Sequence, residues 1–142
     1  MNNPPGFTST PVTNATEDSL YSYTVKVSDS DGDSLIVMAP TIPSWLTFNG
    51  DSLLSGTPND GDVGDHDVII KVTDGFNVSI QDFKITVLSV DDPPVFTSTP
   101  ITIVVEDQAY SYTIAATDID NEDSSLTFSV KKMAAWMEFN GI

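Results

Sequence analysis

The strongest constraint on the fold is an internal repeat, because two parts of the chain carry nearly the same sequence. The second copy follows the first at an offset of 89 residues (91 − 2), and later at an offset of 91 residues (136 − 45). This length exceeds one turn of a solenoid and is typical of whole domains in tandem. The matching pairs are NNPPGFTSTP (2–11) with DDPPVFTSTP (91–100), EDSLYSYTVKVSDSDGD (17–33) with EDQAYSYTIAATDIDNE (106–122), and WLTFNG (45–50) with WMEFNG (136–141).

The repeat predicts two domains of unequal length. We expect a complete repeat at residues 1–90 and the N-terminal half of a second repeat at 91–142, which lacks counterparts of Leu53 to Val90. The chain would then be one and a half repeats of a longer array. The junction Asp91-Asp92-Pro93-Pro94 should be short and stiff, because each proline fixes its own φ and restricts the preceding residue.

Alternation of apolar and polar residues with a period of two predicts β-strands. Tyr21, Tyr23 and Val25 point to one side of a predicted strand, and the same alternation recurs in residues 68–73 and 83–88. Clusters of Asp, Gly, Asn and Pro separate these runs, and no window shows a helical stripe. The pattern predicts an all-β fold, a β-sandwich with Greek-key connections, in tandem and with the second repeat truncated.

Two finer predictions concern the core. Trp45 and Trp136 stand at equivalent positions among apolar residues, so we interpret both as core residues. The apolar alternation changes phase between Val78 and Phe83, which predicts a β-bulge or a strand break near Gln81.

The charge balance excludes several classes of function. Five Lys and no Arg stand against 17 Asp and 4 Glu, a formal net charge of −16. Such a chain repels phosphate backbones and anionic lipids, so we expect no binding to nucleic acid. The chain has no Cys, which excludes disulfide frameworks and thiolate metal sites. His66 is the only histidine, so the sequence disfavours an imidazole-rich metal site and a Ser-His catalytic pair.

The acids gather at strand ends and at the junction, and a D-x-D pattern recurs in both repeats. Such turns fit either Ca²⁺ ligation, because Ca²⁺ takes six to eight oxygen ligands, or simple solvated turns, and the pattern alone leaves both open. Asp29, Asp31 and Asp33 have the spacing of an EF-hand loop. An EF-hand is excluded because the required Gly and Glu, and the flanking helices, are absent. We interpret Asp60, Asp62 and Asp82 as surface charge.

Several segments together resemble the dystroglycan-type cadherin-like domains and the bacterial immunoglobulin-like repeats that occur in tandem in surface and secreted proteins. The resemblance covers all of repeat one and the first half of repeat two, and implies an immunoglobulin-like or cadherin-like sandwich. The segments that carry it are DDPPVF at the junction, EDSLYSYTVKVSDSDGD (17–33), PSWLTFNG (43–50), LSGTPNDGDVGDHDVIIKVTDG (54–75) and QDFKITVLSV (81–90).

Cadherin-like arrays bind Ca²⁺ between successive domains, so the resemblance implies metal ligands here. Glu17 would be the first-strand glutamate, Asp91 and Asp92 the linker ligands, and Asp118 and Asp120 the acidic pair of repeat two. The set facing the other end of repeat one would be Asp29, Asp31 and Asp74, with neutral Asn2 and Asn3 at the linker positions. The cadherin D-R-E motif is replaced by SGTP (55–58), which implies weak binding at about 10⁻⁴–10⁻³ M, as in extracellular modules.

These observations predict a non-catalytic, Ca²⁺-stiffened spacer or adhesion segment of a larger extracellular or cell-surface protein, which the resemblance places in bacteria. Its partners would be neighbouring repeats of the same chain. The alternative is an accessory carbohydrate-binding module with a polysaccharide ligand, for which Phe76 is the best exposed aromatic candidate. An enzyme is disfavoured, because the acids lie in turns rather than in an apolar pocket.

The incomplete second repeat should expose an apolar face and unpaired strand edges. We therefore expect residues 95–142 to be poorly ordered or completed by another chain, as in a dimer. Sedimentation and amide exchange showing a monomer with a well-folded second repeat would contradict this expectation.

Overall fold

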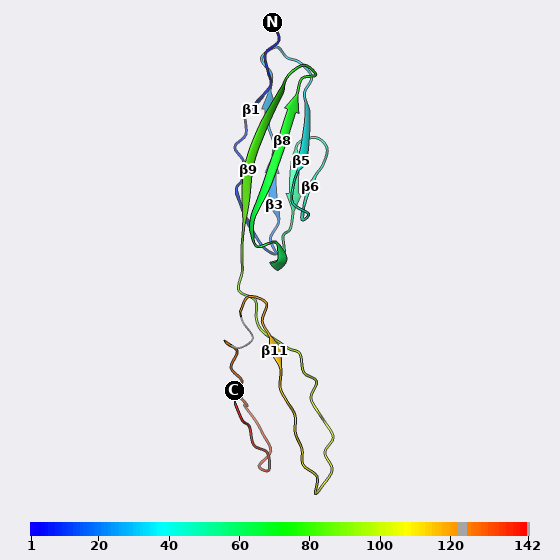
Figure 1. The fold of residues 1–142 in the computed structure, drawn as a ribbon, viewed down its shortest axis with the longest axis vertical. Coiled ribbons are helices and arrows are strands. Elements are labelled where there is room, and N and C mark those ends of the chain that lie inside the picture. The colour runs from blue at the N-terminus through cyan, green and yellow to red at the C-terminus, as the bar shows by residue number, and fades with distance from the viewer. Residues whose placement is uncertain (122–124, 142) are drawn as a thin grey trace. The chain divides into compact units, whose positions relative to one another are not determined.

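The structure is a computed structural model that describes residues 1–121 and 125–141. The chain divides into two compact units, Met1–Val90 (unit 1) and Asp91–Ile142 (unit 2) (Figure 1). Within the described part of the chain, no helix is long and apolar enough to cross a membrane.

Unit 1 consists of strands and one short 3₁₀ helix, η1. The short strands follow the predicted apolar alternation, and the two longest, β8 and β9, form a hairpin with Asp74 and Gly75 in its turn. The elements are β1 (Gly6–Phe7), β2 (Asn14–Thr16), β3 (Tyr21–Thr24), β4 (Val27–Ser28), β5 (Ile36–Thr41), β6 (Leu46–Phe48), β7 (Leu53–Gly56), η1 (Asp60–Asp62), β8 (Gly64–Thr73) and β9 (Val78–Leu88).

Two main sheets form the sandwich. One sheet has the strand order β2-β9-β8-β5, in which β2 runs parallel to β9 and the other pairs are antiparallel. The second sheet has the order β3-β7-β6, and β1 pairs with β4 beside it. Successive strands cross between sheets, as β7 to β8 does. The predicted all-β sandwich is confirmed.

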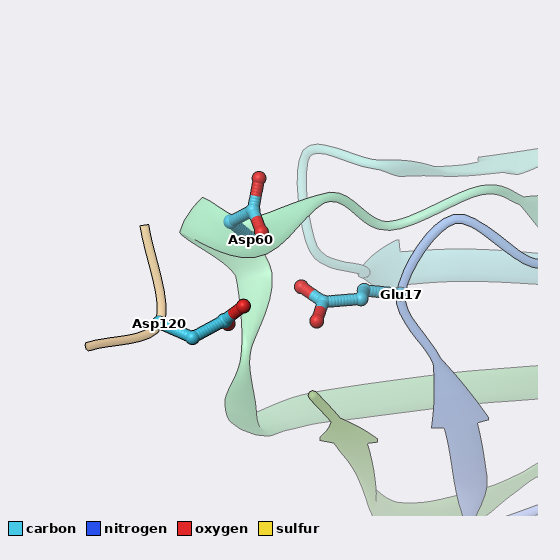
Figure 2. A group of neighbouring side chains, drawn as sticks. All are labelled: Glu17, Asp60 and Asp120. Atoms are coloured by element: carbon cyan, nitrogen blue, oxygen red, sulfur yellow. The ribbon is translucent and has the colours of Figure 1, made fainter. Parts of the chain in front are cut away.

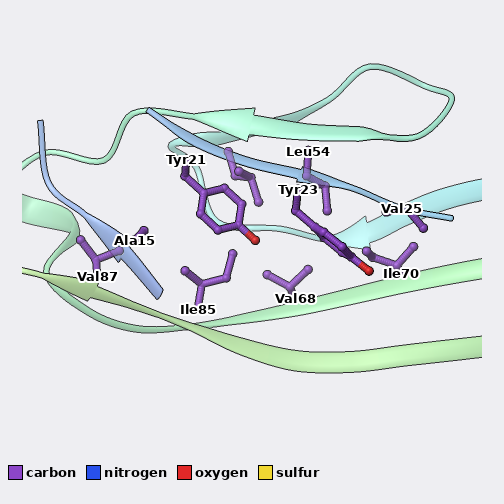
Figure 3. Packing of buried hydrophobic residues seen from close by; sticks show 10 residues of the cluster. Ala15, Tyr21, Tyr23, Val25, Leu54, Val68, Ile70, Ile85 and Val87 are labelled. Atoms are coloured by element: carbon purple, nitrogen blue, oxygen red, sulfur yellow. The ribbon is translucent and has the colours of Figure 1, made fainter. Parts of the chain in front are cut away.

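The core lies between the two sheets (Figure 3). Tyr21 and Tyr23 of β3 come from one sheet, and Val68, Ile70 and Ile85 of β8 and β9 come from the other; none of the five is more than 4% exposed. Burying a side chain of this size contributes about 1.5–3 kcal/mol each. The positions that the alternation placed inward are therefore the ones that stabilise the sandwich.

The tyrosines also carry polar groups into the core, and each hydroxyl finds a partner. The Tyr21 hydroxyl donates to the Val12 carbonyl oxygen at 2.7 Å. The Tyr23 hydroxyl donates to Gln81 Oε1 at 2.9 Å and lies 2.7 Å from Ser9 Oγ. Burial raises the pKa of Tyr21, so it stays a neutral hydrogen-bond donor.

The predicted bulge near Gln81 is wrong. Strands β8 and β9 pair without a register shift from Gly64↔Val87 to Thr73↔Val78. The apparent change of phase arises because Val78 and Ile80 lie on the outer face, 56% and 58% exposed. Gln81 points inward instead, where its amide group donates to the Ser9 carbonyl oxygen. A polar residue with hydrogen-bond partners thus occupies a position that the pattern assigned to an apolar one.

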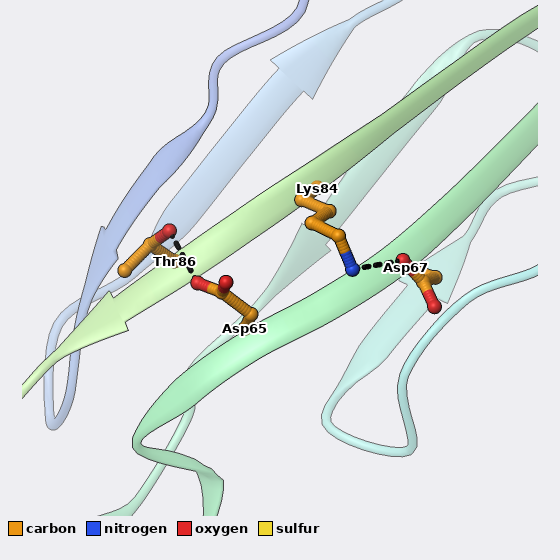
Figure 4. Close-up of polar contacts among 4 residues, drawn as sticks. All are labelled: Asp65, Asp67, Lys84 and Thr86. Carbon is orange, nitrogen blue, oxygen red and sulfur yellow. Dashed lines mark hydrogen bonds and ion pairs between the residues drawn. The ribbon is translucent and has the colours of Figure 1, made fainter.

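The outer face of β8 and β9 carries polar pairs across the strands (Figure 4). Lys84 Nζ lies 2.7 Å from Asp67 Oδ1, and the Thr86 hydroxyl donates to Asp65 Oδ1 at 2.7 Å. The hydrogen bond that Lys84 donates to the Asp67 carboxylate raises the pKa of Lys84. Exposed pairs of this kind contribute little to stability, so this face is a solvated surface.

Unit 2 repeats the local contacts of unit 1 but not its full sandwich. Its described residues hold two strands, β10 (Val95–Phe96) and β11 (Ala116–Thr117). Tyr110 donates to the Ile101 carbonyl oxygen at 2.9 Å and Tyr112 lies 2.7 Å from Ser98 Oγ, as their counterparts do in unit 1. The predicted completion of this unit by another chain stays a prediction.

The prediction that Trp136 is a core residue is wrong for this chain. Trp45 is half-buried and packs edge-on against Tyr21 and His66, with ring centroids 5.7 and 5.9 Å apart. Trp136 keeps the contact with Tyr110 at 5.9 Å but is 62% exposed. The described residues of unit 2 include no strand equivalent to β8, which carries His66 in unit 1, so the ring contact between Trp45 and His66 has no counterpart among them.

Candidate metal centre

Glu17 is positioned by a sharp change of chain direction after β2. Its backbone N–H donates to the Leu88 carbonyl oxygen at 3.0 Å, which extends the pairing with β9 by one residue. Asp18 then adopts a left-handed conformation (φ 57°), and its N–H donates to the Pro58 carbonyl oxygen at 2.8 Å. Asp tolerates this conformation better than most residues. Asp107, the counterpart in unit 2, also has a positive φ of 62°.

The Glu17 carboxylate is buried at one end of unit 1, which we call the C-terminal pole and which also contains η1 and Val90. Glu17 is 1% exposed, and its Oε1 accepts a hydrogen bond from the Val90 N–H. Its Oε2 is buried and has no partner among the residues that the structure describes. A buried ionised oxygen without a partner is costly, and natural proteins rarely keep one without a reason.

Asp60 on η1 is the second acid of this pole (Figure 2). A carboxylate oxygen of Asp60 and one of Glu17 lie within 4.8 Å of each other, and Asp60 Oδ1 is likewise buried with no partner in the described part of the chain. Like charges this close repel, and burial weakens solvent screening. A hard cation with oxygen ligands such as Ca²⁺ would satisfy both oxygens, so these two residues fit a metal ion.

The interpretation of Asp60 and Asp62 as surface charge is wrong. Asn59 caps η1: its Oδ1 accepts from the Gly61 N–H, while Asp62 Oδ2 accepts from the Asn59 N–H. This capping box fixes Asp60 as the first residue of the turn, half-buried beside Glu17. The spacing of Asn59 and Asp62 is a capping signal that the sequence contained, although the proximity of Glu17 depends on the fold.

In unit 2, three of the predicted ligands lie together. Asp92 donates its N–H to Asp120 Oδ2 at 2.5 Å, and Asp118 Oδ1 accepts from the N–H groups of Asp120 and Asn121 at 3.0 and 2.9 Å. Asp91, the other predicted linker ligand, is exposed. The D-x-D pattern is therefore a turn in which the first carboxylate accepts hydrogen bonds from the backbone N–H groups that follow it.

The remaining predicted ligands, Asp29, Asp31 and Asp74, lie at the opposite end of unit 1, which we call the N-terminal pole. It comprises residues 2–3, the loop 29–33 and the turn 74–77. Carboxylate oxygens of Asp29, Asp31 and Asp33 lie within 4.8 Å of one another. Asp29 Oδ1 accepts from the Asp31 N–H at 2.7 Å, the same turn as in unit 2.

Asp74 accepts more hydrogen bonds than its neighbours at this pole. The N–H groups of Asn77 and Phe76 donate to its Oδ1 at 2.6 and 2.7 Å, and the Asn2 side-chain amide donates to its Oδ2 at 2.8 Å. These donors, the Asn77 N–H foremost, lower the pKa of Asp74 from 3.8 to about 2. Asp74 is thus ionised and already has hydrogen-bond partners without any ion.

The comparison with protein families identifies the fold of unit 1. Residues 4–88 match the family described as "Putative Ig domain" (He_PIG), a span that covers nearly all of unit 1. The chain belongs to this immunoglobulin-domain family. No curated protein matches the sequence.

Solved structures agree with the Ig-domain assignment. The chain is similar to human protocadherin-24 EC1-2, with a TM-score of 0.59, 19% identity, and coverage of 92% of this chain and 69% of that one. The SrpA adhesin of Streptococcus sanguinis has a TM-score of 0.50, 15% identity, and coverage of 67% and 65%. At these identities the likeness shows the fold alone. The predicted cadherin-like and immunoglobulin-like sandwich is confirmed.

An enzyme also contains a similar domain. An endo-fucoidan hydrolase of glycoside hydrolase family 107 is 32% identical, with a TM-score of 0.51. The match covers 66% of this chain but 16% of the hydrolase, and a structure of a point variant of that hydrolase is covered to 14%. The chain therefore corresponds to a small part of this enzyme.

Proposed function

We propose that this chain is a non-catalytic, extracellular Ig-like module, a spacer or adhesion segment of a larger surface or secreted protein, and that it binds Ca²⁺ at the ends of its units. The observation that carries the proposal is the buried Glu17 carboxylate, which lies near Asp60 and whose Oε2 has no partner among the described residues. A Ca²⁺ ion would compensate both charges, and its remaining ligands would be waters and further oxygens.

The Asp-rich turns support the same proposal. Asp118 and Asp120 in unit 2 hold carboxylates at a surface, where Asp92 also contributes its backbone N–H. The resemblance to cadherin-like arrays assigns these acids, with Glu17 and Asp91, to one ion shared by neighbouring repeats. In that mechanism the ion bridges carboxylates that otherwise repel, and the array becomes stiffer. This shared site is a proposal that rests on the resemblance.

Calorimetric titration of the chain with Ca²⁺ tests the proposal. We expect binding in the range of about 10⁻⁴–10⁻³ M. The variant Glu17→Gln should abolish the binding at the C-terminal pole, and Asp91→Ala and Asp120→Ala test the shared site. Asp82→Asn is the matched control, because it removes one exposed carboxylate from β9. Titrations of wild type and Glu17→Gln that look the same would refute the role of Glu17.

Small-angle scattering tests the mechanical part of the proposal. A chain with the second repeat completed should show a larger maximum dimension in Ca²⁺ than in chelator, because bridged carboxylates restrict the junction. An unchanged maximum dimension would refute stiffening and would leave the binding result unaffected.

The second candidate is an accessory module of a polysaccharide-active protein. It is supported by the likeness to part of an endo-fucoidan hydrolase and by Phe76, which is 87% exposed in the turn between β8 and β9. An exposed aromatic ring is the usual platform for a sugar. Polysaccharide binding in affinity electrophoresis that disappears in Phe76→Ala, with an unchanged melting temperature, would favour it. If the wild-type chain migrates equally fast in gels with and without each polysaccharide, this candidate is excluded.

A further inference from the structure

The acidic side chains at the two ends of unit 1 differ in their hydrogen-bond partners. At the C-terminal pole, Glu17 Oε2 and Asp60 Oδ1 have no partner among the described residues. At the N-terminal pole, Asn2 and Asn3 supply donors to two of the three acids that the resemblance assigns to a metal. The two poles therefore differ in whether amide groups of the chain donate hydrogen bonds to the carboxylates.

Asn3 holds Asp31 through both of its own nitrogens. The Asn3 backbone N–H donates to Asp31 Oδ2 at 2.6 Å, and the Asn3 side-chain amide donates to Asp31 Oδ1 at 3.1 Å. Both carboxylate oxygens of Asp31 therefore carry a donor. Hydrogen bonds to an ionised acceptor are about twice as strong as neutral ones, so this pair fixes the start of the chain on the loop 29–33.

Asn2 supplies one donor to Asp74. Its side-chain amide donates to Asp74 Oδ2 at 2.8 Å, and the N–H groups of Phe76 and Asn77 occupy Oδ1. Two consecutive side chains thus connect the two acidic segments of this pole. A Ca²⁺ ion would have to displace these donors from the oxygens that it needs.

Unit 2 shows what changes when the asparagines are replaced. Its equivalents of Asn2 and Asn3 are Asp91 and Asp92, at the same offset of 89 residues. The backbone bond is kept, since the Asp92 N–H donates to Asp120 Oδ2 at 2.5 Å, as Asn3 does to Asp31. The side-chain bond cannot be kept, because an ionised carboxylate only accepts. The side-chain amide, which both donates and accepts, is replaced by a carboxylate of the same shape, which only accepts when it is ionised.

We propose that Asn2 and Asn3 take the place of a cation at the N-terminal pole, and that they confine Ca²⁺ binding in unit 1 to the C-terminal pole. Their amide donors hold Asp31 and Asp74 in place, so this pole keeps its geometry without an ion. Asp29 Oδ2 is also buried without a partner in the described residues, and oxygens of Asp29, Asp31 and Asp33 lie within 4.8 Å of one another. Both oxygens of Asp31 in this cluster already accept from Asn3, so an ion would have to displace those donors. The inference deepens the proposed function, because it states which end of the unit takes the ion.

The test converts the asparagines to aspartates. The double variant Asn2→Asp/Asn3→Asp is made in the wild-type chain and in the Glu17→Gln chain, and Ca²⁺ binding and thermal unfolding are measured in chelator and in Ca²⁺. In chelator we expect the double variant to melt several degrees lower, because two charge-assisted donors become two like charges. In Ca²⁺ we expect one additional ion per chain and recovery of the melting temperature, in both backgrounds. Asn140→Asp, an exposed position in unit 2, controls for added charge.

NMR of the Asn2 and Asn3 side-chain amides tests in the wild-type chain whether Ca²⁺ displaces them. The NMR signals of the Asn2 and Asn3 amide groups should stay unchanged when Ca²⁺ is added up to the millimolar range. A double variant that gains no Ca²⁺ would overturn the inference. The inference would also be overturned if the Glu17→Gln chain bound Ca²⁺ and lost this binding when Asp31→Asn was added, because the ion would then bind at the N-terminal pole. The proposed function fails by a different result, namely equal Ca²⁺ binding by wild type and Glu17→Gln, so the two failures can be distinguished.

Discussion

Replacing Glu17 by glutamine should stabilise the chain in the absence of Ca²⁺ and should remove the stabilisation that Ca²⁺ binding gives to the wild type. The substitution keeps the shape of the side chain and its carbonyl oxygen, which can still accept from the Val90 N–H. It removes the charge of a carboxylate that is 1% exposed, and it places an amide donor near Asp60 Oδ1, which has no partner among the described residues. Without an ion, the variant should therefore be more stable than the wild type.

The size of both effects follows from the burial and from the expected affinity. Relief of an unsatisfied buried group contributes about 1–3 kcal/mol, so the variant should gain that amount in chelator. At about 10 mM Ca²⁺ and a dissociation constant of about 10⁻⁴–10⁻³ M, binding stabilises the wild type by about 1.4–2.7 kcal/mol. For a unit of this size, that corresponds to a rise in Tm of roughly 6–20 °C. The variant lacks the site and should show none of this rise.

Thermal unfolding of wild type, Glu17→Gln and the control Asp82→Asn, each in chelator and in Ca²⁺, measures all of these quantities. We expect the variant to be the more stable protein in chelator, and we expect Ca²⁺ to raise the melting temperature of the wild type while leaving that of the variant unchanged. If Glu17→Gln melts lower than the wild type in chelator, the unpartnered carboxylate is not a source of instability. If both chains gain equally in Ca²⁺, Glu17 is not a ligand.

Two further predictions concern the sandwich and its acid sensitivity. A Cβ at Gly56 would lie 2.0 Å from the Trp45 carbonyl oxygen, so Gly56→Ala should force β6 and β7 apart. Urea unfolding should then show a free energy of unfolding lower by several kcal/mol. The control Gly6→Ala should change this free energy little, because open space surrounds Gly6. The pKa of Asp74 is about 2 in the folded chain against 3.8 when unperturbed, so its contribution is complete above about pH 3.8 and is lost as the pH falls through about 2. Asp74→Asn should therefore flatten the fall in stability over that interval, and an unchanged slope would contradict this.

The fold could be predicted from the sequence because its signals are local. Tyr21, Tyr23 and Val25 alternate with polar residues, and the structure buries all three to 4% exposure or less. The failures occur where a polar residue has a specific partner. Gln81 takes an inward position because its amide reaches Ser9 and Tyr23, which are distant in the sequence. No periodicity encodes such a partner, so the pattern suggested a bulge.

The candidate site could be predicted only in part, for a related reason. The repeat placed acids at the ends of the units, and the structure brings Asp29 to Asp31 and Asp118 to Asp120, because residues two apart share a turn. Asp60 was missed, because its proximity to Glu17 depends on how η1 folds against the end of β2. A long-range juxtaposition of this kind requires the whole sandwich to be known.

The choice between asparagine and aspartate at two positions has a consequence for any array built from such units. The two side chains have the same shape, so either fits the start of a unit, and the backbone bond to the D-x-D turn is the same in both repeats. Asn supplies donors to the acids around it, whereas an ionised Asp adds negative charge and can only accept hydrogen bonds. The choice of residue at these two positions, Asn2 and Asn3 in one unit and Asp91 and Asp92 in the other, would then set the Ca²⁺ dependence of each unit separately. A mixed array would respond to Ca²⁺ at some junctions and remain unchanged at others, with no alteration of the sandwich.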